Sequence, residues 1–236
     1  MTAFAGFPKT GLQFLKKLRK NNTREWFEAN RADYEAYVKV PREELVAALN
    51  VEIGKFAPHH VTEPKKAIYR IHRDTRFSAN KSPYKTNLAM LFGRSGATSK
   101  HGAGSFYCSV SDEEVAVGGG VYMPEPEAIY VVRNKIAEDY ARFHKIMTSK
   151  SLSDVMGGLQ GDALKRVPKG FAADHPAAEY LRYKGWFVYR TFPSEGLADT
   201  PELVPMLVKH LKATLPLVDF LNEVLVVPKK PDPMFR

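Results

Sequence analysis

Hydrophobic residues recur at helical spacing through the first quarter of the chain. The earliest group consists of Phe14, Leu15 and Leu18. Asn22 followed by Glu25 resembles a capping box, which predicts the start of a second helix. A third helical segment extends to about residue 56, and Pro41 either starts a fresh helix within it or kinks a continuous one. The pattern therefore predicts helices over most of residues 10–56.

The hydrophobic period changes to two at residue 67, where alternating side chains predict β-strands. The candidate strands are residues 67–73, 88–92, 106–110, 115–122 and 186–189. Residues 80–83 form a predicted turn, and residues 93–104 a glycine-rich connection. Because the first four candidates follow one another along the chain, they predict an antiparallel meander.

Helical spacing returns at residues 124–144, and shorter helical pieces are predicted at 151–159 and 177–181. A last helix follows residue 202. No low-complexity linker or internal repeat interrupts the chain. We predict one α+β domain over residues 1–236, with an antiparallel sheet of about five strands and helices before and after it.

The composition is that of an ordinary globular protein, with 44% hydrophobic and 26% charged residues. A chain of 236 residues buries about 70–75% of the surface that it exposes when unfolded. Cys108 is the only cysteine, so no internal disulfide can form. The first residues lack the features of a signal peptide, and no run of about 18 apolar residues occurs. We expect a cytoplasmic protein with no membrane partner.

The positive charge is concentrated in residues 65–100, called the basic segment. It holds nine lysines and arginines against Asp74 alone, which is +8 of the chain's formal +9. Such a concentration predicts a surface that binds anions. The sequence offers no zinc-ligand set, no nucleophile elbow and no phosphate-binding glycine loop. We therefore predict no metal and no cofactor.

Three arginines of the basic segment lie within seven residues: Arg70, Arg73 and Arg76. The planar donor fork of arginine suits a phosphate or a carboxylate, while Lys81 and Lys85 add point charges and Tyr84 a hydroxyl donor. The surrounding cations should lower the pKa of Asp74, which makes this residue a poor general acid. It could orient an arginine, share a metal with a phosphate, or act as a weak base.

A structural ion-pair network is the alternative. In that network Asp74 pairs with one arginine, and the other cations are solvated. One carboxylate cannot neutralise five cations, and each unpaired buried ion would cost several kcal/mol. The composition leaves the network and the ligand site equally open.

The same residues carry a family resemblance. The run Arg70-x-x-Arg73-Asp74-x-Arg76-Phe77-x-x-x-Lys81-x-x-Tyr84 resembles the signature of DUF2461, a family of unknown function. Residues 22–34, 120–124 and 164–176 are similar to other blocks of that family. The resemblance brings no activity with it, but it implies that the blocks converge on one cleft.

Under that hypothesis the cleft contains three groups of residues. The ligand-binding set is Arg70, Arg73, Arg76, Lys81 and Tyr84, joined by Arg24, Asn30, Tyr34, Lys169 and Lys184. Asp74 and His175 are the candidate catalytic residues, and His175 is chosen because histidine is the side-chain type best suited to acid–base chemistry near neutral pH. Alternatively, Asp174 caps a helix that begins at Pro176, and His175 has no role.

Three functions fit these residues. The first is a site for a phosphorylated or other anionic small molecule, with or without a reaction. The second is a module for RNA or single-stranded nucleic acid, whose bases would stack on aromatic residues between the cations. These aromatics are Tyr69, Phe77, Tyr84 and Phe92. The third is a structural or interaction protein whose basic face meets an acidic partner. The sequence does not determine the oligomeric state.

Overall fold

The computed structural model describes residues 4–97, 99 and 101–226. They form two compact units, which are described separately. Unit 1 consists of the described residues of Met1–Phe92, Phe106–Gly118 and Tyr189–Lys212, and unit 2 of those of Gly93–Ser105, Gly119–Val188 and Ala213–Arg236. Lys100, the last cation of the basic segment, lies outside the described residues. The single domain inferred from the sequence stays a prediction.

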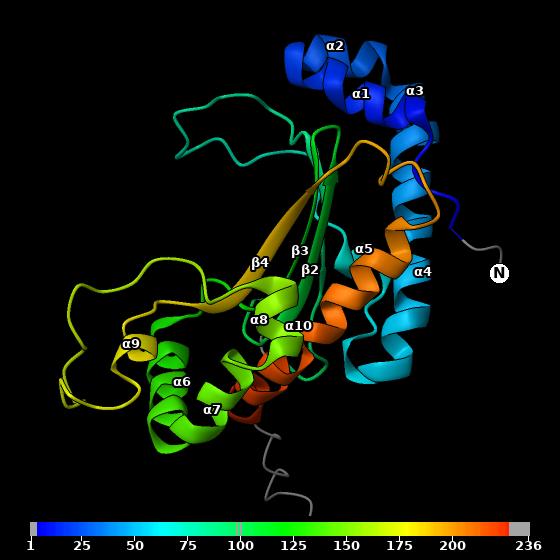
Figure 1. The fold of residues 1–236 in the computed structure, drawn as a ribbon. Helices are drawn as coiled ribbons and strands as arrows, with labels where there is room; N and C mark the ends of the chain where they lie inside the picture. The colour runs from blue at the N-terminus through cyan, green and yellow to red at the C-terminus, as the bar shows by residue number, and fades with distance from the viewer. Residues whose placement is uncertain (1–3, 98, 100, 227–236) are drawn as a thin grey trace, which may run out of the picture. The chain divides into compact units, whose positions relative to one another are not determined.

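Unit 1 begins with the predicted helices. They are α1 (Lys9–Lys20), α2 (Arg24–Ala29), α3 (Arg31–Tyr34) and α4 (Val40–Phe56). The first three lie together near one end of α4 (Figure 1). The prediction that Asn22 caps α2 is wrong, because the side chain of Thr23 accepts the hydrogen bond from the Trp26 N–H at 3.2 Å. The side chain of Asn22 is used elsewhere, as described below.

A π-helical turn, η1 (Glu35–Lys39), joins α3 to α4 without a break. Pro41 causes this turn, because a proline has no N–H to donate to the Tyr37 carbonyl four residues earlier. The helix widens instead, and the Val40 N–H donates to the carbonyl of Glu35. Gly11 of α1 packs against the Tyr37 carbonyl oxygen, which would lie 2.1 Å from an added Cβ. Of the two readings of Pro41, the continuous helix is correct.

Two short helices, η2 (Pro58–His60) and α5 (Pro64–Ala67), lead into the signature segment. The strand predicted at residues 67–73 does not form. This segment pairs with the chain ahead of it only through two isolated bridges, Ile68 with Met90 and His72 with Tyr84. Pro83 accepts a hydrogen bond from the Arg73 N–H at 2.8 Å but has no N–H to return, so a regular ladder cannot continue.

The described residues form one antiparallel sheet of four strands in the order β1-β2-β3-β4. The strands are β1 (Asn87–Phe92), β2 (Ser105–Ser111), β3 (Glu114–Val121) and β4 (Trp186–Pro193). Asn87 pairs with Ser111 and Phe92 with Phe106. An α+β fold with helices before and after the sheet is therefore confirmed, with four strands where about five were predicted.

Cys108 of β2 is completely buried. Burial raises the pKa of its thiol, because the charged thiolate is poorly solvated inside the protein.

The remaining helices are α6 (Pro126–Glu138), α7 (Tyr140–Met147), α8 (Lys150–Met156), α9 (Ala178–Leu181) and α10 (Leu203–Leu225). The helix predicted at residues 124–144 is divided in two at Asp139. The chain passes from unit 1 into unit 2 within α10, after Lys212.

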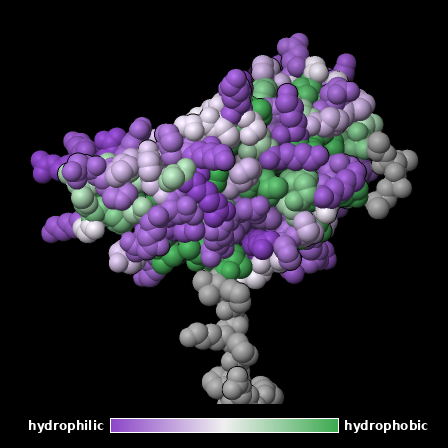
Figure 2. Space-filling model, turned by 60° about the horizontal axis from the view of Figure 1, so that its bottom comes forward, coloured by the Kyte–Doolittle hydropathy of each residue, from purple (hydrophilic) through white to green (hydrophobic). Residues whose placement is uncertain are grey.

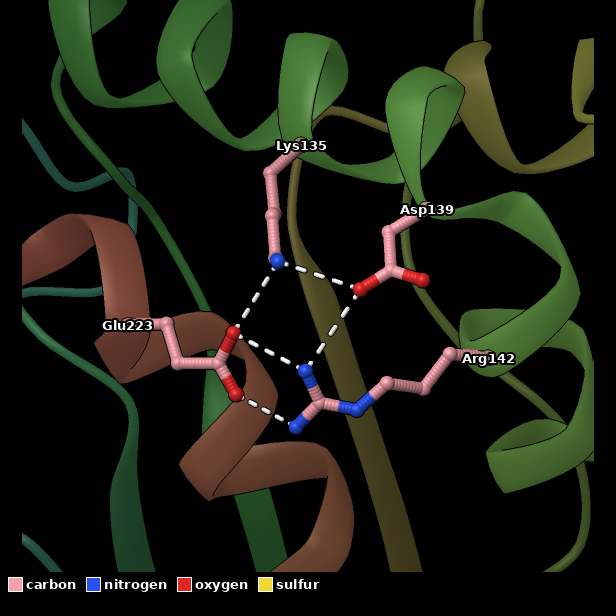
Figure 3. A network of polar contacts seen from close by, with 4 residues as sticks. All are labelled: Lys135, Asp139, Arg142 and Glu223. Atoms are coloured by element: carbon pink, nitrogen blue, oxygen red, sulfur yellow. Dashed lines mark hydrogen bonds and ion pairs between the residues drawn. The ribbon is translucent and has the colours of Figure 1, made fainter.

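Four charged side chains of unit 2 connect α6, α7 and α10, and they are called the paired network (Figure 3). Its members are Lys135, Asp139, Arg142 and Glu223. The Lys135 ammonium lies 3.1 Å from the Asp139 carboxylate and 3.0 Å from that of Glu223. Arg142 pairs with the same two carboxylates. Both cations also lie 5.2 Å from the ring centre of the buried Phe220.

Hydrophilic residues dominate the face drawn in Figure 2, with hydrophobic residues scattered among them. Across the part of the chain that the structure describes, every helix is too short or too polar to span a membrane.

Candidate functional site

The signature residues form an open loop in unit 1, between His72 and Tyr84 (Figure 1). Two side chains hold the loop in shape. The Arg73 guanidinium donates to the carbonyl of Ser82 and to the hydroxyl of Ser78, both at 3.3 Å. The Lys81 ammonium donates to the carbonyl of Thr75 at 3.0 Å. Arg73 and Lys81 thus both bind the backbone of the segment that carries them.

Asp74 pairs with Arg76 on the surface of this loop. The guanidinium donates to both carboxylate oxygens, at 3.0 and 2.8 Å, and the Arg76 backbone N–H donates at 3.2 Å. These hydrogen bonds lower the pKa of Asp74 to about 2, the bond from the Arg76 side chain contributing most. At neutral pH Asp74 is therefore a carboxylate whose charge is balanced by a neighbour.

Phe77 follows this ion pair and is 96% exposed. The guanidinium carbon of Arg76 lies 5.7 Å from its ring centre. The loop therefore presents one large apolar side chain to solvent.

Tyr84 ends the loop and attaches it to α2. Its ring stacks on that of Phe27 with the ring centres 4.1 Å apart, and its exposed fraction is 3%. The Asn22 amide donates to the Tyr84 carbonyl and accepts from the Tyr84 N–H, both at 3.0 Å. These two bonds mimic a strand partner, so Asn22 fixes the backbone where the loop returns.

A cavity of about 300 Å³ lies beside the returning chain in unit 1. Its lining residues are Arg19, Asn22, Arg73, Asn80, Ser82, Tyr84, Lys85, Thr86 and Asn87. Two of them, Arg73 and Tyr84, belong to the predicted ligand-binding set. The other predicted members from the loop, Arg70, Arg76 and Lys81, are exposed and do not line the cavity.

Arg70, Arg73 and Lys85 are called the cation cluster. No described carboxylate pairs with any of the three. The pKa of Lys85 is lowered, first by partial burial and then by the positive charges of Arg70 and Arg73. Its ammonium lies 4.9 Å from the ring centre of Tyr69. Besides Arg73 and Lys85, the cavity is lined by one more cation, Arg19. Arg19 is neutralised by Asp112 and Glu113, so the uncompensated charge at the cavity comes from the cation cluster.

The predicted helix residues of unit 1 do not line the cavity. Arg24 is the exposed first residue of α2. The Asn30 amide donates to the Trp26 carbonyl at 2.8 Å, and the hydroxyl of the buried Tyr34 accepts from Arg42 at 3.4 Å. Asn30 and Tyr34 therefore stabilise the helices, and a ligand-binding role for all three stays a prediction.

The predicted residues of unit 2 belong to the segments before and after α9 in the sequence. Lys169 and Lys184 are exposed. The suggestion that Asp174 caps a helix beginning at Pro176 is wrong, because α9 begins at Ala178 and has no side-chain cap. Instead, Nδ1 of His175 accepts a hydrogen bond from the Ala177 N–H at 3.0 Å. The convergence of these residues with the signature loop stays a prediction, as does catalysis by His175.

A family model described as "Conserved hypothetical protein (DUF2461)" matches residues 10–220 of the chain. The chain belongs to DUF2461. Neither the curated proteins nor the solved structures contain a significant match to it. The DUF2461 match confirms the family resemblance inferred from the sequence and brings no substrate or reaction with it.

Sequence reasoning missed most of the cavity of this DUF2461 chain. Lys85 was named beside Lys81 as a point charge next to the three arginines, but the predicted ligand-binding set included Lys81 and left Lys85 out. Asn22 lies in a block that resembles the family, but its pattern was interpreted as a helix cap. Arg19 carried no signal, because it reaches the site through a contact between distant parts of the chain.

Proposed function

We propose that the cavity of unit 1 binds an anionic small molecule, whose phosphate or carboxylate group is held by Arg73 and Lys85. The observation that supports this best is the lack of a described carboxylate partner for the cation cluster. A guanidinium fork and an ammonium at one polar cavity match the oxygens of a phosphate. An external anion would supply the charge that the surrounding chain does not.

The lowered pKa of Lys85 supports an anion site at this cluster. Partial burial disfavours the protonated ammonium most, and the like charges of Arg70 and Arg73 add to the effect. A bound anion would offset these like charges. We therefore expect ligand binding to raise the pKa of Lys85, and affinity to fall at alkaline pH as this ammonium loses its proton.

The proposal includes binding and assigns no reaction. Asp74 holds no proton to donate at neutral pH, since its pKa is about 2. It also does not line the cavity. Positioning and electrostatic stabilisation of a bound anion are what Arg73 and Lys85 could contribute to catalysis.

Thermal denaturation with inorganic phosphate or pyrophosphate tests the proposal. A ligand at 100 times its Kd stabilises the folded protein by about 2.7 kcal/mol, so the melting temperature of the wild type should rise. Lys85→Met should lose most of this rise. Lys65→Met, which removes the same charge from an exposed position in α5, should keep it. Equal rises in the two variants, or none in the wild type, would contradict the assignment.

Nucleic-acid binding remains the second candidate because of Phe77. Phe92 and Tyr84 are buried, and Tyr69 is half-buried beneath Lys85, so Phe77 is the exposed ring among the four aromatics named from the sequence. One base could stack on it, with a gain of about 1–3 kcal/mol. Fluorescence anisotropy of a labelled single-stranded oligonucleotide at several salt concentrations should then show steep salt dependence and a clear loss with Phe77→Ala. An unchanged affinity in that variant would exclude stacking at this ring.

A further inference from the structure

The lining of the cavity is unusual for a ligand site. Pockets for small molecules are mostly lined by hydrophobic and aromatic side chains, with a few polar groups. The nine lining residues of this cavity are all polar, and Tyr84 is the one aromatic among them. A ligand that fits such a lining presents polar groups on several sides and not only at a single anionic end.

The unused hydrogen-bonding groups of the cavity lining indicate which polar groups a ligand must carry. The hydroxyls of Ser82 and Thr86 and the amide of Asn87 make no side-chain hydrogen bond within the described chain. Asn80 uses its carbonyl oxygen to accept from the Ser82 N–H at 2.9 Å, which leaves its NH₂ group available. The cavity therefore offers both donors and acceptors that are not yet used.

A phosphate ion uses mainly the donors of this set and leaves its acceptors unused. Its oxygens mainly accept hydrogen bonds at neutral pH, so they suit Arg73, Lys85 and the NH₂ group of Asn80. The oxygen atoms of Ser82, Thr86 and Asn87 can also accept, and a ligand that used them would supply the donors. Hydroxyl groups both donate and accept, and several on one carbon chain would match these three residues.

The cavity is less suited to a nucleobase. The Tyr84 ring is covered on one side by Phe27 at 4.1 Å and has an exposed fraction of 3%, so it offers no free face for stacking. A volume of about 300 Å³ is also at the lower end for ligand pockets. Both observations favour a small, hydroxyl-rich molecule over a nucleotide.

We infer that the natural ligand is a phosphorylated sugar or polyol. This inference rests on the proposed function, because its phosphate occupies the anion site at Arg73 and Lys85. The hydroxyl groups of the ligand then bind Ser82, Thr86 and Asn87.

Isothermal titration calorimetry with four probes tests the inference: inorganic phosphate, glucose 6-phosphate, glucose and adenosine 5′-monophosphate. Glucose 6-phosphate should bind about tenfold tighter than inorganic phosphate, since two or three neutral hydrogen bonds are added. Glucose should bind weakly, because it lacks the anion. Adenosine 5′-monophosphate should gain less over inorganic phosphate than glucose 6-phosphate does.

Two isosteric variants locate the hydroxyl contacts. Thr86→Val should weaken glucose 6-phosphate binding about fivefold and leave inorganic phosphate binding unchanged. Thr75→Val is the matched control, because Thr75 is a half-buried threonine like Thr86 but does not line the cavity. Circular dichroism and the ligand-free melting temperature establish that both variants are folded. The four probes are also compared in the wild type, so the inference can be tested even if a variant does not fold.

The possible outcomes separate the two proposals. Tighter binding of glucose 6-phosphate, with a selective loss in Thr86→Val, supports both. Equal affinities for phosphate and glucose 6-phosphate, or tightest binding of the nucleotide, overturn the hydroxyl inference and leave the anion site standing. No binding of any phosphate overturns the anion site and with it the inference.

Discussion

The two units treat clustered charge in opposite ways. In the paired network of unit 2, two cations meet two carboxylates, and each cation contacts both (Figure 3). In the cation cluster of unit 1, three cations have no described carboxylate partner. The one acid of the basic segment, Asp74, is paired with Arg76.

This difference distinguishes a structural role from a binding role. A network that balances its own charge has nothing left to attract a ligand, and its contribution is to stability. A cluster that leaves charge uncompensated lowers stability slightly and favours an external anion. The shifts in pKa have opposite directions as well, since that of Lys135 is raised by hydrogen bonds to Glu223 and Asp139 and that of Lys85 is lowered.

The largest expected effect comes from one buried aromatic ring in each unit: Phe220 beneath the paired network, and Phe27, on which the cavity residue Tyr84 stacks. Phe27→Ala and Phe220→Ala should each lower the free energy of unfolding by about 3–5 kcal/mol, because both rings are buried. Only Phe27→Ala should also weaken phosphate binding, since Tyr84 stacks on that ring. Urea denaturation and calorimetry measure the two effects. Phe77→Ala is the control, and an equal destabilisation by this exposed residue would contradict the prediction.

A smaller loss of stability is expected for Glu223→Gln, which removes the carboxylate shared by Lys135 and Arg142. At neutral pH the free energy of unfolding should fall by about 1 kcal/mol, a low value because Glu223 is partly exposed. The hydrogen bond from Arg142 lowers the pKa of Glu223 below its ordinary 4.5. Its contribution is therefore complete above about pH 4.5 and is lost as the pH falls through the folded-state pKa.

Urea denaturation at pH 7 and pH 3 would test this dependence, and the wild type and Glu223→Gln should converge in acid. Glu138→Gln, at an exposed position of α6 without a described ion-pair partner, serves as the control. A loss that stays constant down to pH 3 would mean that charge pairing is not its cause.

Replacing one lysine in each cluster should change stability in opposite directions. Lys135→Met removes a paired cation and should destabilise the protein. Lys85→Met removes a cation that burial and like charges disfavour, and should stabilise it by about 0.5 kcal/mol at neutral pH. The penalty of Lys85 is present below its folded-state pKa and disappears as the pH rises towards 10.5, so the gain should vanish in alkali. If both variants shift the urea midpoint in the same direction, the two clusters do not differ in their effect on stability and the prediction is wrong.

The smallest effect concerns the exposed pair beside the cluster. Arg76→Ala should raise the pKa of Asp74 from about 2 towards 3.8, with no measurable change in the unfolding midpoint at pH 7. Any contribution of the Asp74–Arg76 pair to the free energy of unfolding is present above pH 3.8 and is lost as the pH falls towards 2. A carboxyl titration followed by NMR measures the shift. Arg70→Ala should shift the pKa less, because Arg70 acts only through its charge; a larger shift would reverse the assignment of the pair.

Local patterns predicted the fold well. Alternation at residues 88–92 and 106–110 revealed β1 and β2, because a strand turns successive side chains to opposite faces. The same reasoning failed at 67–73, where the outcome depended on the partner strand. Pro83 interrupts the ladder there, and alternation within one segment does not show what lies opposite it.

The site was harder to predict for a related reason. The charge of the basic segment pointed to Arg73 and to an anion. The choice between Lys81 and Lys85 depends on how the loop returns, which the Asn22 amide and the Phe27 ring determine from about sixty residues away. Composition cannot report such contacts, because they join parts of the chain that are distant in sequence.

The burial of Cys108 makes the rate of thiol labelling a measure of how often β2 opens. A thiol reagent reacts with the thiolate, which burial disfavours, so labelling requires β2 to open first. With one cysteine in the chain, each modified molecule records one opening at a known position. The labelling rate at increasing urea would tell whether this strand opens locally or only when the whole protein unfolds. No engineered reporter is needed for that experiment.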